Sequence, residues 1–148
     1  MEKNNPLIST NPKLIETKIL LVATGLLLVL SIGAKAAEAA SLYFSPSSGS
    51  FTVGEQFSAG VFVSSPDQAM NAASGIISFP EDKLEVVSLS KSGSIISLWV
   101  QEPSFSNGLG TINFEGIALN PGFQGSAGKI ITANFKVKTI GTASISFS

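Results

Sequence analysis

The side chains that could do chemistry here are carboxylates and serines, because the 148-residue sequence contains neither His nor Cys. A serine nucleophile needs an adjacent general base, and no histidine can supply one. A glycosidase needs two carboxyl groups across a cleft. Glu102 and Glu115 could form such a pair, since both adjoin predicted strands near Trp99. Charged side chains mostly lie at the surface, so the simpler interpretation is two solvated acids, and we predict no enzyme.

Metal ligands are equally sparse. Asp67, Glu81, Asp82 and Asn107 are scattered, and no D-x-[DN]-x-[DN]-G run is present. A calcium ion held partly by loop carbonyls is the alternative, but ordinary turn chemistry explains these residues more simply. The net charge of −1 gives no basic footprint for nucleic acid. We therefore expect no cofactor, no metal and no nucleic-acid partner.

The N-terminal residues 1–39 have the order of an export signal. A polar extension and two lysines precede the apolar run 19–34, and the small-x-small sites Ala34-Lys35-Ala36 and Ala37-Glu38-Ala39 follow it. The run has 16 residues, fewer than the roughly 20 that span a bilayer. We predict a cleavable signal peptide, with an uncleaved transmembrane anchor as the alternative. Either way, the domain that follows is secreted or held at the cell surface, and it contacts a membrane only through this segment.

The remaining residues, 41–148, are predicted to form one domain made of short strands. Apolar residues alternate with polar ones, and Gly, Pro, Ser and Asn separate the runs, a pattern typical of a sandwich or barrel. We expect strands at 42–44, 56–64, 71–79, 84–89, 94–101, 111–118, 129–138 and 143–147. Loops are expected at 65–68 and 102–110, and a type II turn at 120–122. The core is predicted to contain Phe44, Phe57, Phe79, Phe114 and Phe135.

The stretch 71–89 organises this domain, because two strand signals meet at a Pro80-Glu81-Asp82-Lys83 turn. Its pattern, F-P-x-D-K-L-E-V, resembles the cohesin domain. The resemblance continues in order along residues 41–148, through Val53-Gly54-Glu55, Phe135-Lys136-Val137-Lys138 and Gly141-Thr142-Ala143-Ser144-Ile145. It implies an antiparallel two-sheet jelly-roll sandwich related to carbohydrate-binding modules. The family closes this sandwich with one more strand beside the first, so we expect the C-terminal strand to be missing here.

The resemblance also implies a function, which is non-catalytic binding of a dockerin-type protein partner, linked to polysaccharide breakdown. The family's partner-facing sheet corresponds to the strands predicted at 72–79, 94–101, 111–118 and 143–147. Its outward residues would be Ser74, Ile76, Ser78, Trp99, Gln101, Asn113 and Glu115. Trp99, the only Trp, packs in the core in one strand register and faces outward as an anchor in the other. Two further functions stay open: a carbohydrate-binding module and a structural domain of a surface protein.

Overall fold

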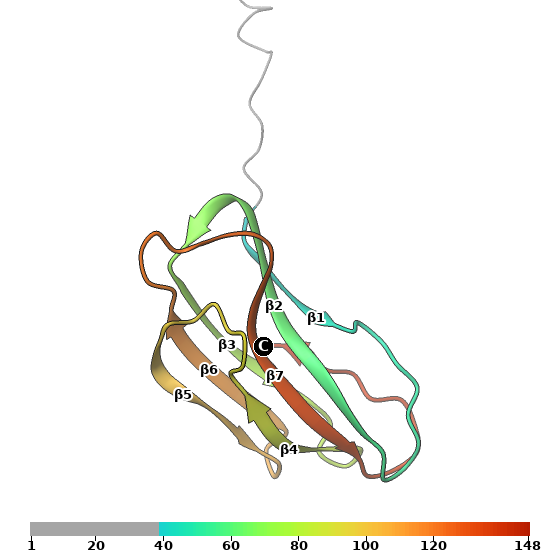
Figure 1. The fold of residues 1–148 in the computed structure, drawn as a ribbon. Coiled ribbons are helices and arrows are strands. Elements are labelled where there is room, and N and C mark those ends of the chain that lie inside the picture. The colour runs from blue at the N-terminus through green and yellow to red at the C-terminus, as the bar shows by residue number, and fades with distance from the viewer. Residues whose placement is uncertain (1–38) are drawn as a thin grey trace, which may run out of the picture. The chain divides into compact units, whose positions relative to one another are not determined.

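The computed structural model describes residues 39–148, which contain strands and, within that range, no helix. Figure 1 shows the strands, which are β1 (Ser41–Ser45), β2 (Gln56–Met70), β3 (Ala72–Ser78), β4 (Leu84–Ser90), β5 (Leu98–Ser106), β6 (Thr111–Ile117), β7 (Phe123–Val137) and β8 (Ser146–Phe147).

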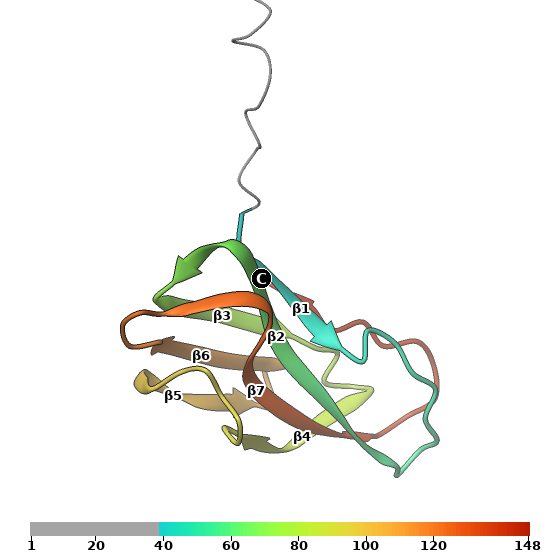
Figure 2. The ribbon, with the colours of Figure 1, turned by 45° about the horizontal axis from the view of Figure 1, so that its top comes forward.

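The strands form two sheets that lie face to face (Figure 1, Figure 2). One sheet has the order β1-β2-β7-β4, and the other has the order β5-β6-β3-β8. Neighbouring strands are antiparallel throughout. Few neighbours are consecutive in the chain, so the connections repeatedly cross from one sheet to the other, as in a jelly roll. The predicted all-β class and the antiparallel two-sheet sandwich are confirmed.

The alternation predicted for the long strand before residue 138 is confirmed in β7. Ile131, Ala133 and Phe135 are each at most 1% exposed and face the opposite sheet. Ile130 is also fully buried, although simple alternation placed it on the outer side. The register between β2 and β7 shifts at this position, so Ile130 is the extra residue of a β-bulge and turns inward.

The core lies between the sheets and contains the five predicted phenylalanines. Phe79, Phe114 and Phe135 are buried, and Phe44 and Phe57 pack against them while partly exposed. The ring of Phe135 lies 5.4 Å from that of Phe57 and 5.5 Å, edge-on, from that of Phe79. Burying one such side chain contributes about 1.5–3 kcal/mol, so these rings are a main source of the domain's stability.

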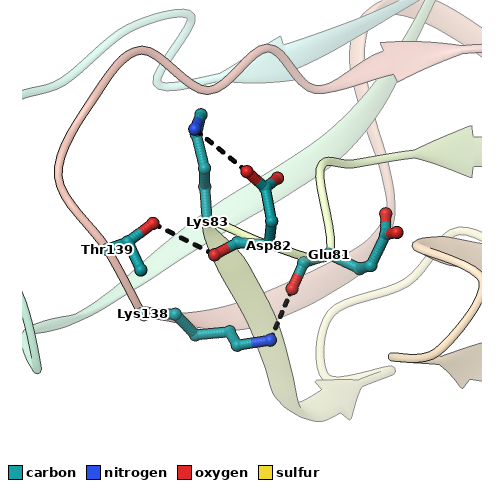
Figure 3. Close-up of polar contacts among 5 residues, drawn as sticks. All are labelled: Glu81, Asp82, Lys83, Lys138 and Thr139. Atoms are coloured by element: carbon teal, nitrogen blue, oxygen red, sulfur yellow. Dashed lines mark hydrogen bonds and ion pairs between the residues drawn. The ribbon is translucent and has the colours of Figure 1, made fainter.

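The turn between β3 and β4 is held by the residues that follow β7 (Figure 3). Three consecutive carbonyls of the turn accept hydrogen bonds from two consecutive residues: Glu81 O from Lys138 Nζ, Asp82 O from Thr139 Oγ1 at 3.0 Å, and Lys83 O from Lys138 N at 2.7 Å. The turn that organises the sequence is thus also an anchor for the connection from β7 to β8.

The structure differs from two local predictions in this part of the fold. The predicted loop at 65–68 belongs to β2, which continues through Pro66 to Met70 with irregular pairing to β7. The predicted type II turn is also wrong, because Gly122 N donates to Leu119 O at 2.8 Å. That bond places Pro121 at the third turn position, whereas a type II turn has proline at the second.

The predicted export segment lies outside the described residues. None of the described residues 39–148 forms a helix with the length and hydropathy to cross a membrane. The expected further strand beside β1 is not tested by the described residues and stays a prediction. Within the described part of the chain, β1 has β2 as its one neighbour.

Candidate functional site

The pairing of β3 with β6 defines the outer face of the second sheet. Ser74 lies opposite Glu115, Ile76 opposite Asn113, and Ser78 opposite Thr111. The residues between them, such as Ile77, Ile112 and Phe114, are buried in the core. Cross-strand partners share a side of the sheet, so the predicted residues of β3 and β6 all face outward together. We call this side the outer face of the β5-β6-β3-β8 sheet.

Trp99 does not belong to this outer face, and its predicted outward position is wrong. β5 begins at Leu98 rather than at Ser94, and Trp99 pairs with Gly116. Gly116 lies on the core side, where an added Cβ would come within 3.2 Å of the indole ring. Trp99 is half-buried and packs against the core. Its ring is flanked by Lys91, whose Nζ lies 5.9 Å from the ring centroid.

Gln101 returns to the outer face because β5 is irregular. The register between β5 and β6 shifts between Trp99 and Gln101, and Gln101 pairs with Glu115. Val100 is the extra residue of this bulge and is 57% exposed. A second shift follows before Ser104, which pairs with Asn113. β5 therefore includes the first part of the loop predicted at 102–110. The two bulges allow the strand to stay paired with β6 over these residues.

The outer face also contains residues that were not among the predicted site residues. They are Ala72, Leu98, Ser104, Ser106, Thr111, Ile117 and Ser146. Thr111 and Ile117 follow from simple alternation in β6, so that signal was present. The β5 residues could not be placed, since two register shifts interrupt the alternation.

The outer face is organised in rows that run across the strands. Ala72, Ile117 and Leu98 form an apolar row at one end, in which Leu98 is 54% exposed. A row of hydroxyl side chains, Ser78, Thr111, Ser106 and Ser146, lies at the other end. The two middle rows contain Ile76, which is 45% exposed, among neutral polar residues and Glu115. Such a mixture of exposed apolar and polar groups suits contact with another macromolecule.

The two carboxylates considered for catalysis lie in different surroundings. Glu102 lies on the irregular part of β5 and is bonded to Lys91, with Nζ and Oε2 2.6 Å apart. Glu115 lies on the outer face of the sheet, one row removed from the apolar end. Among residues 39–148, no group of three or more His, Cys, Asp or Glu side chains is placed to hold a metal ion.

A cavity of about 560 Å³ lies elsewhere, between the β1–β2 connection and residues 139–145. Phe44, Phe51 and Phe57 line it together with serines and threonines of the two loops. None of the predicted site residues contributes to its lining. The cavity and the outer face are therefore separate features.

Comparison with solved structures identifies the fold. The third cohesin of ScaC from Acetivibrio cellulolyticus, solved with the ScaB dockerin, matches with a TM-score of 0.53 and 23% identity, over 65% of this chain and 72% of that one. The second type II cohesin of the ScaA scaffoldin from the same organism gives a TM-score of 0.59 and 15% identity, over 76% and 72% of the chains.

A third similar structure is the OlpC cohesin in complex with a dockerin from Clostridium thermocellum. It gives a TM-score of 0.58 and 11% identity, over 78% of this chain and 83% of that one. No protein-family model matches the sequence, and no curated protein matches it. Identities this low show the fold alone. The sandwich of residues 39–148 has the cohesin fold.

Proposed function

We propose that this domain is a non-catalytic interaction module that binds a dockerin-type protein through the outer face of the β5-β6-β3-β8 sheet. The observation that carries the proposal is the structural similarity to cohesins, several of which were solved with a dockerin bound. The motifs along residues 41–148 support it independently, since they resemble the same family.

The chemistry of the outer face supports a protein partner. Leu98 and Ile76 are each about half exposed on the outer face, and neutral hydroxyl and amide groups lie beside them. Exposed aliphatic side chains within a polar rim are the usual composition of a protein interface. In this proposal Leu98 and Ile76 are the anchors, and Trp99 supports β5 from the core side.

The proposal includes export, because residues 1–39 have the order of a signal peptide or anchor. The domain would act outside the cell or at its surface, where polysaccharide-degrading assemblies work. No base–nucleophile pair is available to make it an enzyme, since the chain contains neither His nor Cys.

Two matched variants test the proposed face. Ile76 is 45% exposed on the outer face, and Val87 is 46% exposed on β4 of the other sheet. We expect Ile76→Asp to weaken binding of a dockerin at least tenfold, because it places a charge at an apolar contact. Val87→Asp should leave the affinity unchanged. Equal losses in both variants would contradict the assignment of the face, and absence of binding to a broad set of dockerins would contradict the function.

Carbohydrate binding is the second candidate, and one feature of the other sheet favours it. Tyr43 and Phe62 pair across β1 and β2 on the outer side of that sheet, with ring centroids 5.6 Å apart and planes 21° apart. Aromatic side chains with a polar tip are common at wet binding surfaces. Binding to a glycan array that disappears in Phe62→Ala would support this function. A protein that binds neither glycan nor dockerin would be a structural domain of a surface protein.

A further inference from the structure

Glu115 is the one ionisable side chain in the four rows of the outer face of the β5-β6-β3-β8 sheet. It is exposed and lies between Ser74 on β3 and Gln101 on β5. The apolar row with Leu98 lies on one side of it along the strands, and the row with Ile76 lies on the other. Rows on one face of a strand are about 7 Å apart, so exposed aliphatic groups flank the carboxylate closely on both sides.

Residues 39–148 provide no counter-ion for Glu115. The sequence contains no Arg, and each lysine of the described residues has another partner. These pairs are Lys83 with Asp82, Lys91 with Glu102, Lys129 with Ser92 O, Lys136 with Glu85, and Lys138 with Glu81 O. Ser74 and Gln101 can offer neutral hydrogen-bond donors only.

A partner that covers this face would remove water from around Glu115. A carboxylate that loses its hydration without gaining a cation is strongly unfavourable, so such a partner would be rejected. A partner that brings a cation forms a charge-assisted hydrogen bond in its place. The carboxylate therefore selects among partners that fit the apolar positions equally well.

We propose that Glu115 determines partner specificity by requiring a Lys or Arg side chain on the docking surface, flanked by apolar residues that contact Leu98 and Ile76. This inference rests on the proposed function and adds the chemistry of the partner. Arginine fits the position best, because its several donors can bond the carboxylate while another reaches the amide oxygen of Gln101.

The experiment uses the full chain in mild detergent and a displayed library of natural dockerin modules as the probe. Dockerins selected by the wild-type chain are measured by calorimetry against E115Q, E115K and the control E85Q. Glu85 is a matched carboxylate on the other sheet, with Oε1 3.3 Å from Lys136 Nζ. Each affinity is measured at about 0.1 M and about 1 M salt, where the screening length falls from about 10 Å to about 3 Å.

We expect E115Q to lower the affinity roughly tenfold or more and to flatten its salt dependence, while E85Q changes neither. E115K should abolish binding, and replacing the basic residue of the selected dockerin by Glu should restore binding to E115K alone. Selected dockerins that bind E115Q and E115K as tightly as the wild-type chain would overturn this inference but leave the proposed function standing. Failure to select any dockerin would overturn the function and the inference together.

Discussion

The amide of Asn107 bonds the backbone of β4, and removing it gives a sharp test of the structure. Asn107 Oδ1 accepts from Val86 N at 2.7 Å, and Asn107 Nδ2 donates to Val86 O at 3.0 Å. Val86 is 3% exposed, and β4 is the last strand of its sheet. Among residues 39–148, no further strand lies on that side to pair with β4. Asn107→Ala therefore leaves a buried N–H and a buried C=O without their partners.

The expected loss follows from these two bonds. A hydrogen bond contributes a net 0.5–1.5 kcal/mol or so, and a buried group left unsatisfied costs about 1–3 kcal/mol. Because β4 is an edge strand, water can reach these backbone groups in part and limit the penalty. We expect Asn107→Ala to lower the free energy of unfolding by about 2–4 kcal/mol, a large share of the roughly 5–15 kcal/mol typical of a domain. Asn107→Asp keeps the acceptor for Val86 N but loses the donor, so its effect should be intermediate.

The matched control is Asn113→Ala. Asn113 has the same side chain, lies on the outer face of β6, and has no hydrogen bond from its amide to residues 39–148 in the structure. Its removal should change the free energy of unfolding by less than about 0.5 kcal/mol. Denaturant unfolding of the variants gives both values. A loss below about 1 kcal/mol for Asn107→Ala, or equal losses at the two positions, would refute the proposed role of the amide.

Three further predictions concern the core, a close contact and the export segment. Phe135→Ala should cost about 3–5 kcal/mol and Lys136→Ala little; equal melting shifts would mean that the β7 register is wrong. Gly116→Ala should destabilise by about 1–3 kcal/mol, since the new Cβ would meet Ile96 Cγ2 at 2.3 Å, and an unchanged denaturation midpoint would contradict this packing. N-terminal sequencing of the exported protein should find a start at Ala37 or Ala40, whereas a chain beginning at Met1 would favour the anchor.

The regular strands could be predicted from the sequence, because apolar and polar side chains alternate in them over many consecutive residues. In β3 and β6 the pattern runs without interruption, so Ser74, Ile76, Asn113 and Glu115 were placed on the correct side. The phenylalanines of the core were found for the same reason. Ile130 was missed, since it is one extra residue inserted into an otherwise regular alternation, and the sequence gives no sign of the insertion.

β5 could not be predicted, because its start and its two register shifts depend on the tertiary structure. Residues 94–97 precede the strand, although Ile96 is buried and reads as part of a continuous apolar run. Their backbone is held by other strands instead: Ile95 N donates to Lys129 O at 2.8 Å, and Ser97 N donates to Ile117 O at 2.9 Å. These contacts join residues distant in sequence, and local periodicity contains no information about them.

The position of Trp99 changes what the outer face can recognise. With Trp99 outward, one aromatic anchor would dominate binding, and a flat sugar surface would compete with a protein as the ligand. With Leu98 outward instead, the exposed contacts are aliphatic, and the bulge at Val100 adds a third such group at the edge of the sheet. Aliphatic side chains stack poorly on sugars but pack well against the apolar side of a helix. The register shift that sequence reasoning missed is therefore the feature that most favours a protein partner on this face.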